Sequence, residues 1–160
     1  MKAIAKVFDI IGTVTILLVF VLCLSLAVPK LLGFQTYAVM SGSMEPNIPV
    51  GSVIYAGDVD PATLGEGDVI VFYNGKSDVP ITHRVVRNDT DKAEVITKGD
   101  ANQKEDAPIP YENVIGVVKV HIPYLGHIFA VMSTVSGKLA LVAVALAGTL
   151  FCVLSKILDR

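Results

Sequence analysis

The chain has 160 residues, of which 52% are hydrophobic and 18% charged, and its mean hydropathy is +0.62. The length fits one ordinary domain, but the composition is too apolar for a freely soluble enzyme and excludes intrinsic disorder and collagen. The net charge of −2 is unevenly distributed, because residues 30–119 carry 8 Lys and Arg against 13 Asp and Glu. Such an acidic segment argues against nucleic acid as a partner.

The first apolar run covers residues 10–29, which are 20 uncharged residues in succession. As an α-helix this run would be about 30 Å long, the thickness of the hydrocarbon core of a bilayer. A cleavable secretory signal is the alternative, but its apolar part is usually about 7 to 15 residues long. The length therefore favours a transmembrane helix that is retained.

A second run of 17 uncharged residues lies between Lys138 and Lys156. We expect the segment 127–156 to contain a second transmembrane helix. The run is near the lower length limit for a span and contains Gly148, so an apolar packing helix is the alternative.

The basic residues predict the orientation of the two spans. Lys2 and Lys6 precede the first run, and the positive-inside rule therefore places residues 1–9 in the cytoplasm. Residues 30–126 would then lie across the membrane, and residues 157–160 would form a second cytoplasmic end.

The segment 30–126 is expected to consist of short strands. Residues typical of strands concentrate in five runs, separated by glycines and by Asn-Asp and Asn-Gly turns: 52–56, 68–73, 79–86, 94–98 and 114–122. Both cysteines lie in the apolar runs, so no disulfide is available to this segment. The predicted fold class is mainly β, a small curled antiparallel sheet flanked by an N-terminal and a C-terminal transmembrane helix.

The sequence Ser-Gly-Ser-Met-Glu-Pro at residues 41–46 follows soon after the first apolar run. Gly42 frees the backbone and Pro46 stiffens the exit, so a serine here can be held exposed near the membrane surface. Taken alone, such a cluster is more often a plain loop than the site of a nucleophile.

His83 is the polar exception on one face of the expected strand 79–86. Strand alternation places Val79, Ile81 and Val85 on the same face. A core histidine with satisfied hydrogen bonds is the structural alternative. The functional interpretation is a base, because an imidazole within hydrogen-bonding reach activates a serine hydroxyl.

The acidic stretch 98–106 leaves a strand and turns sharply. A carboxylate beside His83 would fix the tautomer of the imidazole and stabilise the imidazolium. Asp100 and Asp106 both qualify. The alternative is a solvated loop whose aspartates bind their own backbone.

Taken in order, these segments resemble signal peptidase I. The matching motifs are residues 41–46, His-Arg-Val-Val at 83–86, the stretch 98–106, and Ile-Pro-Tyr-Leu-Gly at 122–126. The resemblance is to the endoplasmic-reticulum and archaeal-type branch, also found in some Gram-positive bacteria, in which histidine replaces the usual bacterial lysine. Ala101 stands where that family more often has asparagine, a change that leaves the expected chemistry intact.

The resemblance implies a membrane-bound serine endopeptidase that removes signal peptides from exported precursors. It matches Ser43 to the nucleophile and His83 to the general base. Asp106 matches the aspartate that orients the histidine, and Asp100 a second functionally important aspartate, but which of the two faces His83 stays open. Ser41 matches a position that helps to hold the oxyanion, beside the backbone N–H of Ser43. No metal or cofactor is implied.

The resemblance also implies the surroundings of the enzyme. The expected partners are precursors with signal peptides, the lipid bilayer, and subunits of a secretion complex. The substrate would lie extended along a sheet edge, with two shallow apolar pockets for small side chains at the first and third residues before the cut. The expected location is the cell membrane with the catalytic domain on the extracytoplasmic side, and the endoplasmic-reticulum membrane is the alternative.

Two rival interpretations remain. A Ser-Lys dyad would have to use Lys76, Lys92 or Lys98, none of which lies on an apolar strand face where burial could lower its pKa. The second rival is a non-catalytic, membrane-anchored β domain that binds a surface or secretion partner. The sequon at residues 88–90 lies in an expected turn, and the sequence leaves open whether Asn88 is glycosylated.

Overall fold

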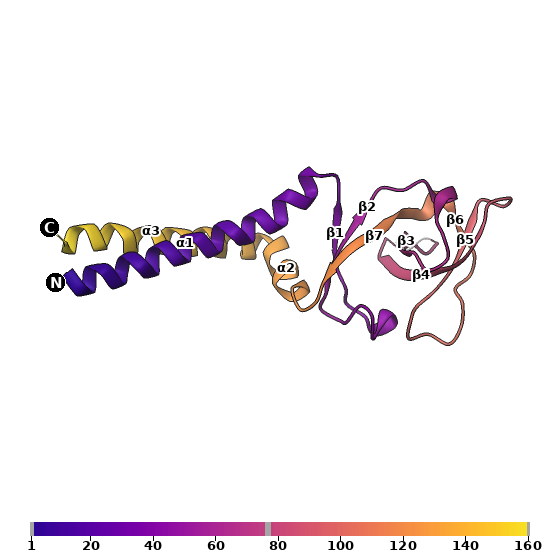
Figure 1. Cartoon of the computed structure of the whole chain (residues 1–160), viewed down its shortest axis with the longest axis horizontal. Helices are drawn as coiled ribbons and strands as arrows, with labels where there is room; N and C mark the ends of the chain where they lie inside the picture. The colour runs from indigo at the N-terminus through magenta and orange to yellow at the C-terminus, as the bar shows by residue number, and fades with distance from the viewer. Residues whose placement is uncertain (1, 76–77, 160) are drawn as a thin grey trace. The chain divides into compact units, whose positions relative to one another are not determined.

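The computed structural model of the chain describes residues 2–75 and 78–159. These residues form two units: the described residues up to Val28 together with those from Ala130 onward, and those within Pro29–Phe129. Long helices make up the first unit and a curled sheet the second (Figure 1).

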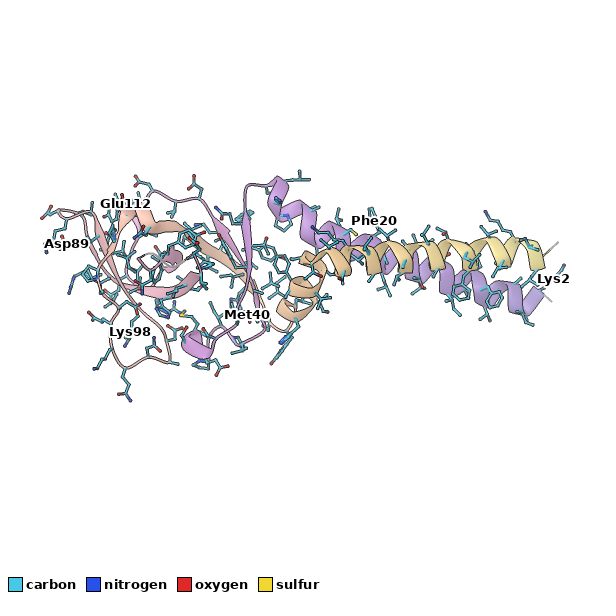
Figure 2. All side chains as sticks on the ribbon, turned by 180° about the vertical axis from the view of Figure 1, so that it is seen from behind. Lys2, Phe20, Met40, Asp89, Lys98 and Glu112 are labelled. Carbon is cyan, nitrogen blue, oxygen red and sulfur yellow. The ribbon has the colours of Figure 1, made fainter. Side chains whose placement is uncertain are left out.

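The two apolar runs form the helices α1 (Lys2–Leu31) and α3 (Val135–Leu158). Both helices are long and apolar enough to cross a membrane. Helix α1 starts well before the uncharged run, because residues 2–9 contain no residue that breaks a helix. Phe20, labelled in Figure 2, projects outward from α1 and is 60% exposed.

The expected C-terminal segment 127–156 contains two helices rather than one. A short helix α2 (Gly126–Ser133) precedes α3, and Thr134 separates them as the N-cap of α3, where its hydroxyl accepts a hydrogen bond from Gly137 N–H at 3.0 Å.

The helices α1 and α3 run antiparallel and pack closely through glycine. A Cβ atom on Gly12 would lie 2.7 Å from the carbonyl oxygen of Gly148 and 2.5 Å from Sγ of Cys152. The rings of Phe8 and Phe151 also meet, with centroids 5.5 Å apart. Small residues permit such close approach between two helices, so this pair has a defined interface.

The second unit is a seven-stranded antiparallel sheet with the order β1-β2-β7-β3-β4-β5-β6. The strands are β1 (Gln35–Ala38), β2 (Val53–Gly57), β3 (Val69–Tyr73), β4 (Pro80–Asp89), β5 (Glu94–Lys98), β6 (Ile109–Pro110) and β7 (Val114–Ile122). This sheet confirms the predicted fold class, and it adds the short strands β1 and β6 to the five runs expected. The 3₁₀-helices η1 (Gly42–Met44), η2 (Pro61–Thr63) and η3 (Tyr111–Asn113) connect strands.

The sheet curls because its strands are irregular. Register shifts interrupt the ladders at Tyr55/Ala56, Val71/Phe72 and Val85/Arg87, and bulges of this kind bend a strand and increase its twist. The curvature, visible in Figure 1, gives the sheet two buried apolar clusters, one containing Phe72 and the other containing Met44.

Candidate active site

Ser43 lies in η1 between two fixed points. The next residue, Met44, is only 1% exposed and packs in the core against Ile54 and Val71. On the other side, the carbonyl oxygen of Ser43 accepts a hydrogen bond from Ala101 N–H at 2.9 Å. The apolar side chain of Met44 and the turn after β5 therefore hold the backbone of the serine without using its hydroxyl.

Gly99 makes this close approach possible. A Cβ atom on Gly99 would lie 2.6 Å from the carbonyl oxygen of Ser43 and 2.7 Å from Nδ2 of Asn102. A side chain at this position would push η1 away from the turn, so the glycine of the Lys-Gly-Asp sequence is required for packing.

Ser41 lies beside Ser43. The two hydroxyl oxygens are 3.4 Å apart, close enough for a weak hydrogen bond in which either can donate. The backbone of Ser41 is extended and η1 begins directly after it. The structure thus places two serine hydroxyls side by side at the start of one short helical turn.

His83 lies in the interior of β4, directly opposite Ile70 of β3. Its side chain is buried, and the ring of Phe72 approaches edge-on with a centroid distance of 6.1 Å. Its Nδ1 lies 2.6 Å from Oδ2 of Asp106. When Nδ1 carries the proton and donates it to this carboxylate, Nε2 keeps a free lone pair, which is the tautomer that a general base needs.

Asp106 is itself held by β5. Its N–H donates to the carbonyl oxygen of Thr97 at 2.8 Å, and the hydroxyl of Thr97 donates to its Oδ2 at 2.6 Å. The sequence offered no signal for Thr97, because the residue belongs to an ordinary strand run and its contact with Asp106 depends on how the loop returns to β5.

Asp100 lies elsewhere, in a network that connects three segments. Arg84 donates to both carboxylate oxygens, from Nε to Oδ1 at 2.8 Å and from Nη2 to Oδ2 at 2.7 Å. Nδ2 of Asn47 donates to Oδ2 at 2.8 Å. The hydrogen bond from Arg84 and the one from Asn47 hold the pKa of Asp100 below its ordinary value, against the opposing effect of burial.

The same ion pair raises the pKa of Arg84, chiefly through its hydrogen bond to Asp100. Nη1 of Arg84 also donates to the carbonyl oxygen of Gly67 at 2.8 Å. The structure therefore brings Asp106 to His83, and it joins Asp100 to Arg84 and to Asn47, which lies in the chain shortly after Ser43.

A groove with a volume of about 420 Å³ leads to the two serines. Residues 37–40, which form the end of β1 and its continuation, line one side, and residues 79–82, at the start of β4, line the other. Ser41, Ser43 and Met44 complete the lining. Most of these side chains are apolar, so the groove suits an extended peptide with uncharged side chains.

Both sides of the groove are edges of strands. Strand β1 is the outermost strand of the sheet and, within the described ranges 2–75 and 78–159, pairs only with β2. In the same ranges β5 pairs with β4 only from Arg84 onward, so β5 does not cover the first residues of β4. Tyr37 is neutral at neutral pH, and burial together with the electrostatic effect of Tyr73 raises its pKa further above the ordinary value of 10.0. An uncharged groove between the outer edge of β1 and the first residues of β4, which β5 does not cover, is suited to pairing with a peptide backbone.

The lysines of the rival dyad have different surroundings. Nζ of Lys92 donates to Oδ2 of Asp89 at 2.8 Å, the lysine side chain is 70% exposed, and this hydrogen bond to Asp89 raises the pKa of Lys92. The environment of Lys92 opposes the deprotonated form that a base requires. Lys98 lies at the end of β5 opposite Arg84, and Lys76 lies outside the described residues. Among residues 2–75 and 78–159, no cluster of three or more His, Cys, Asp or Glu side chains could hold a metal ion.

The sequon asparagine Asn88 is part of β4, not of a turn. Its Nδ2 donates to the carbonyl oxygens of Pro61 and Leu64, both at 2.9 Å, and its Oδ1 accepts from the hydroxyl of Tyr111 at 2.6 Å. The nitrogen that would carry a glycan is therefore already used to fix η2 against the sheet.

The sequence matches one known family over most of the β unit and part of α1. The family model described as "Signal peptidase, peptidase S26" matches residues 11–101, which include Ser41, Ser43, His83 and Asp100. The match covers more than half of the chain.

Similar curated proteins are catalytic subunits of the signal peptidase complex. The SEC11 subunit of Zygosaccharomyces rouxii is 33% identical over 102 residues, which are 56% of this chain and 60% of that protein. The subunit of Sclerotinia sclerotiorum is 36% identical over 109 residues (59% and 62%), and the SEC11C subunit of Rattus norvegicus is 31% identical over 118 residues (66% and 62%).

The matched parts are thus less than two thirds of the relatives' own lengths. The family model and these relatives agree with each other and with the order of the motifs along the chain. The chain belongs to the signal peptidase family, peptidase S26, in its endoplasmic-reticulum-type branch.

Proposed function

We propose that this chain is a membrane-anchored serine endopeptidase that cleaves signal peptides from exported precursor proteins. Ser43 is the nucleophile, His83 the general base and Asp106 the residue that orients His83. The observation that carries this proposal is the buried imidazole of His83, whose Nδ1 lies 2.6 Å from the carboxylate of Asp106. His83 belongs to β4, and η1, which contains Ser43, lies against this strand. Such a pair has the donor and acceptor pattern of a hydrolytic Ser-His-Asp site.

Acylation begins when Oγ of Ser43 attacks the carbonyl carbon of the scissile peptide bond. The hydroxyl proton passes to Nε2 of His83, and the carboxylate of Asp106 stabilises the imidazolium that results. The negative charge on the former carbonyl oxygen is stabilised by the backbone N–H of Ser43 and the hydroxyl of Ser41. His83 then gives its proton to the leaving nitrogen, the C–N bond breaks, and an ester on Ser43 remains.

Deacylation repeats these steps with water. A water molecule gives a proton to Nε2 of His83 and attacks the ester carbonyl carbon. When the second tetrahedral intermediate collapses, the bond to Ser43 Oγ breaks and His83 returns the proton to that oxygen. The products are the free carboxyl end of the signal peptide and the restored enzyme.

The groove between residues 37–40 and 79–82 is the proposed binding site for the residues before the cut. The outer edge of β1 and the first residues of β4 would pair with the substrate backbone, and the apolar lining would accept small uncharged side chains. Backbone pairing supplies affinity that depends little on sequence, which suits an enzyme that processes many precursors.

The helices α1 and α3 are the proposed membrane anchors, with residues 1–9 and 157–160 cytoplasmic and the β unit on the opposite side. Anchoring confines enzyme and precursor to one surface and raises their effective concentration. The relatives are named as subunits of a signal peptidase complex, so we propose further complex subunits as partners. Their eukaryotic origin favours the endoplasmic-reticulum membrane over the cell membrane.

The test is cleavage of a signal-bearing model precursor by the full chain in detergent or lipid. Ser43→Ala and His83→Ala should reduce turnover below detection, because loss of a triad nucleophile or base costs about 10⁶-fold in comparable serine proteases. Ser41→Ala should lower kcat by about 100-fold, the usual loss for one oxyanion donor. His121→Ala, which removes an exposed histidine of β7, is the matched control and should retain activity.

The rivals predict other outcomes. Cleavage that survives Ser43→Ala would refute the nucleophile, and a Lys98→Ala variant as inactive as His83→Ala would favour a lysine base. A wild type that leaves every precursor intact, and whose Ser43 does not react with a serine-directed fluorophosphonate, would favour the non-catalytic binding domain.

A further inference from the structure

A fully buried threonine of β5 binds the carboxylate that faces His83. Thr97 is 0% exposed, and its hydroxyl donates to Oδ2 of Asp106 at 2.6 Å. The same oxygen lies 2.6 Å from Nδ1 of His83. The carbonyl oxygen of Thr97 also accepts the N–H of Asp106 at 2.8 Å. Thr97 therefore holds Asp106 at two points, and one of them is the oxygen that His83 uses.

The register of β4 and β5 accounts for this contact. Thr97 pairs with Val85, which lies two residues after His83 on β4. Residues two apart on a strand project from the same face, so Thr97 and His83 share one face of the sheet. Because threonine is branched at Cβ, its side chain has few rotamers and its hydroxyl direction is well defined.

We propose that Thr97 is a positioning residue of this active site. Its hydroxyl fixes the carboxylate of Asp106 so that Oδ2 faces Nδ1 of His83, and this keeps the proton of the imidazole on Nδ1 and the lone pair on Nε2. The effect on turnover rests on the function proposed above, whereas the effect on the proton of His83 does not.

The exposure of Asp106 explains why such a residue is needed. Its side chain is 24% exposed, so water can compete for the carboxylate and allow it to rotate away from the imidazole. A donor that is already buried and held by its own strand does not have to be reoriented during the reaction, which is the advantage of a preorganised site.

Three substitutions of Thr97 distinguish the effect of its hydroxyl from the effect of its side-chain shape. Thr97→Val keeps the branched shape and removes the donor, Thr97→Ser keeps the donor, and Thr97→Ala removes both. Ser52→Ala is the matched control, because Ser52 is also 0% exposed and its hydroxyl donates at 2.6 Å to the carbonyl oxygen of Pro49 rather than to Asp106.

The readouts are kcat and KM for precursor cleavage, the melting temperature of the full chain, and the NMR resonance of the His83 Nδ1 proton. Thr97→Val should lower kcat by about tenfold with KM unchanged, a part of the 10²–10⁴-fold that general acid–base catalysis contributes. Thr97→Ser should stay within about twofold of the wild type in kcat. The Nδ1 proton should resonate far downfield in the wild type and Thr97→Ser and move upfield in Thr97→Val.

The control variant Ser52→Ala should have a lower melting temperature but the same kcat and the same His83 Nδ1 proton resonance as the wild type. The proposal is overturned if Thr97→Val leaves kcat and the resonance unchanged, or if Thr97→Ser and Thr97→Val lose activity equally, because a merely structural role predicts one of these results. If Thr97→Val does not fold, the same comparison is made between Thr97→Ser and Thr97→Ala. If the wild type does not cleave precursors, the proposed function fails, and the resonance alone then decides the role of Thr97.

Discussion

The aspartates Asp100 and Asp106 belong to one loop but have different partners. Asp106 contacts the imidazole of His83 at 2.6 Å, whereas Asp100 binds the guanidinium of Arg84 and the amide of Asn47. Asn47 follows Ser43 closely in the chain, and Arg84 follows His83 directly. Asp100 therefore joins the serine segment to the histidine strand, and its expected contribution is to the geometry of the site rather than to proton transfer.

Substitution of Arg84 tests this connection. Arg84→Lys keeps the charge but cannot form the two parallel hydrogen bonds to Asp100, so we expect a loss of about 1 kcal/mol in the free energy of unfolding. Activity should fall as well, because the segment after η1, which is tied to Asp100 through Asn47, is then held less firmly to β4. Denaturant unfolding and precursor cleavage measure the two effects.

The exposed ion pair between Lys92 and Asp89 provides the control for that variant. Its lysine is 70% exposed, and exposed pairs contribute little to stability. Lys92→Met should therefore leave both unfolding and cleavage unchanged. Equal behaviour of Arg84→Lys and Lys92→Met would show that the Arg84 network has no special role.

At the scale of elements, the packing of α1 against α3 depends on an absent side chain. The hydrogen of Gly12 faces Gly148 and Cys152, where a Cβ atom would already be too close. The next residue, Thr13, lies about 100° further around the helix and is exposed. Position 12 therefore faces α3, whereas position 13 does not.

A leucine at each of these positions distinguishes the two faces. Gly12→Leu should force the helices apart and destabilise the helical unit by about 1–3 kcal/mol, the usual cost of overpacking. Thr13→Leu should be neutral, because it adds an apolar group on the exposed face. Thermal unfolding in detergent measures both, and a neutral Gly12→Leu would contradict the close packing of α1 and α3.

At the scale of the whole molecule, the pH dependence of stability follows from the lowered pKa of Asp100. A carboxylate whose pKa is lower in the folded than in the unfolded chain stabilises the fold fully above its ordinary value of 3.8. This stabilisation is lost as the pH falls from that value through the lowered one, since the unfolded chain takes up the proton first.

The comparison of the wild type with Asp100→Asn isolates this contribution. The melting temperature of the wild type should exceed that of Asp100→Asn at pH 5 to 7, and the difference should shrink as the pH falls below about 4. Melting of the full chain in detergent across this range measures it. A difference that grows on acidification would show that Asp100 does not have a lowered pKa in the folded protein.

Many of the strands can be predicted from local patterns in the sequence. Strand runs 79–86, 94–98 and 114–122 correspond closely to β4, β5 and β7, because alternation and β-branched residues act over a few neighbours. The strands β1 and β6 were missed because they have only four and two residues. Such short strands exist because a partner distant in sequence pairs with them.

Two apolar runs around a mainly β unit, and ordered motifs that resemble the signal peptidase family, can be recognised without coordinates. Those are properties of composition and local pattern. Three features come from the folded chain alone: Asp106 rather than Asp100 faces His83, Thr97 supports Asp106, and a groove lies between β1 and β4. These contacts join segments far apart in the chain through strand register and loop closure, which no local pattern encodes.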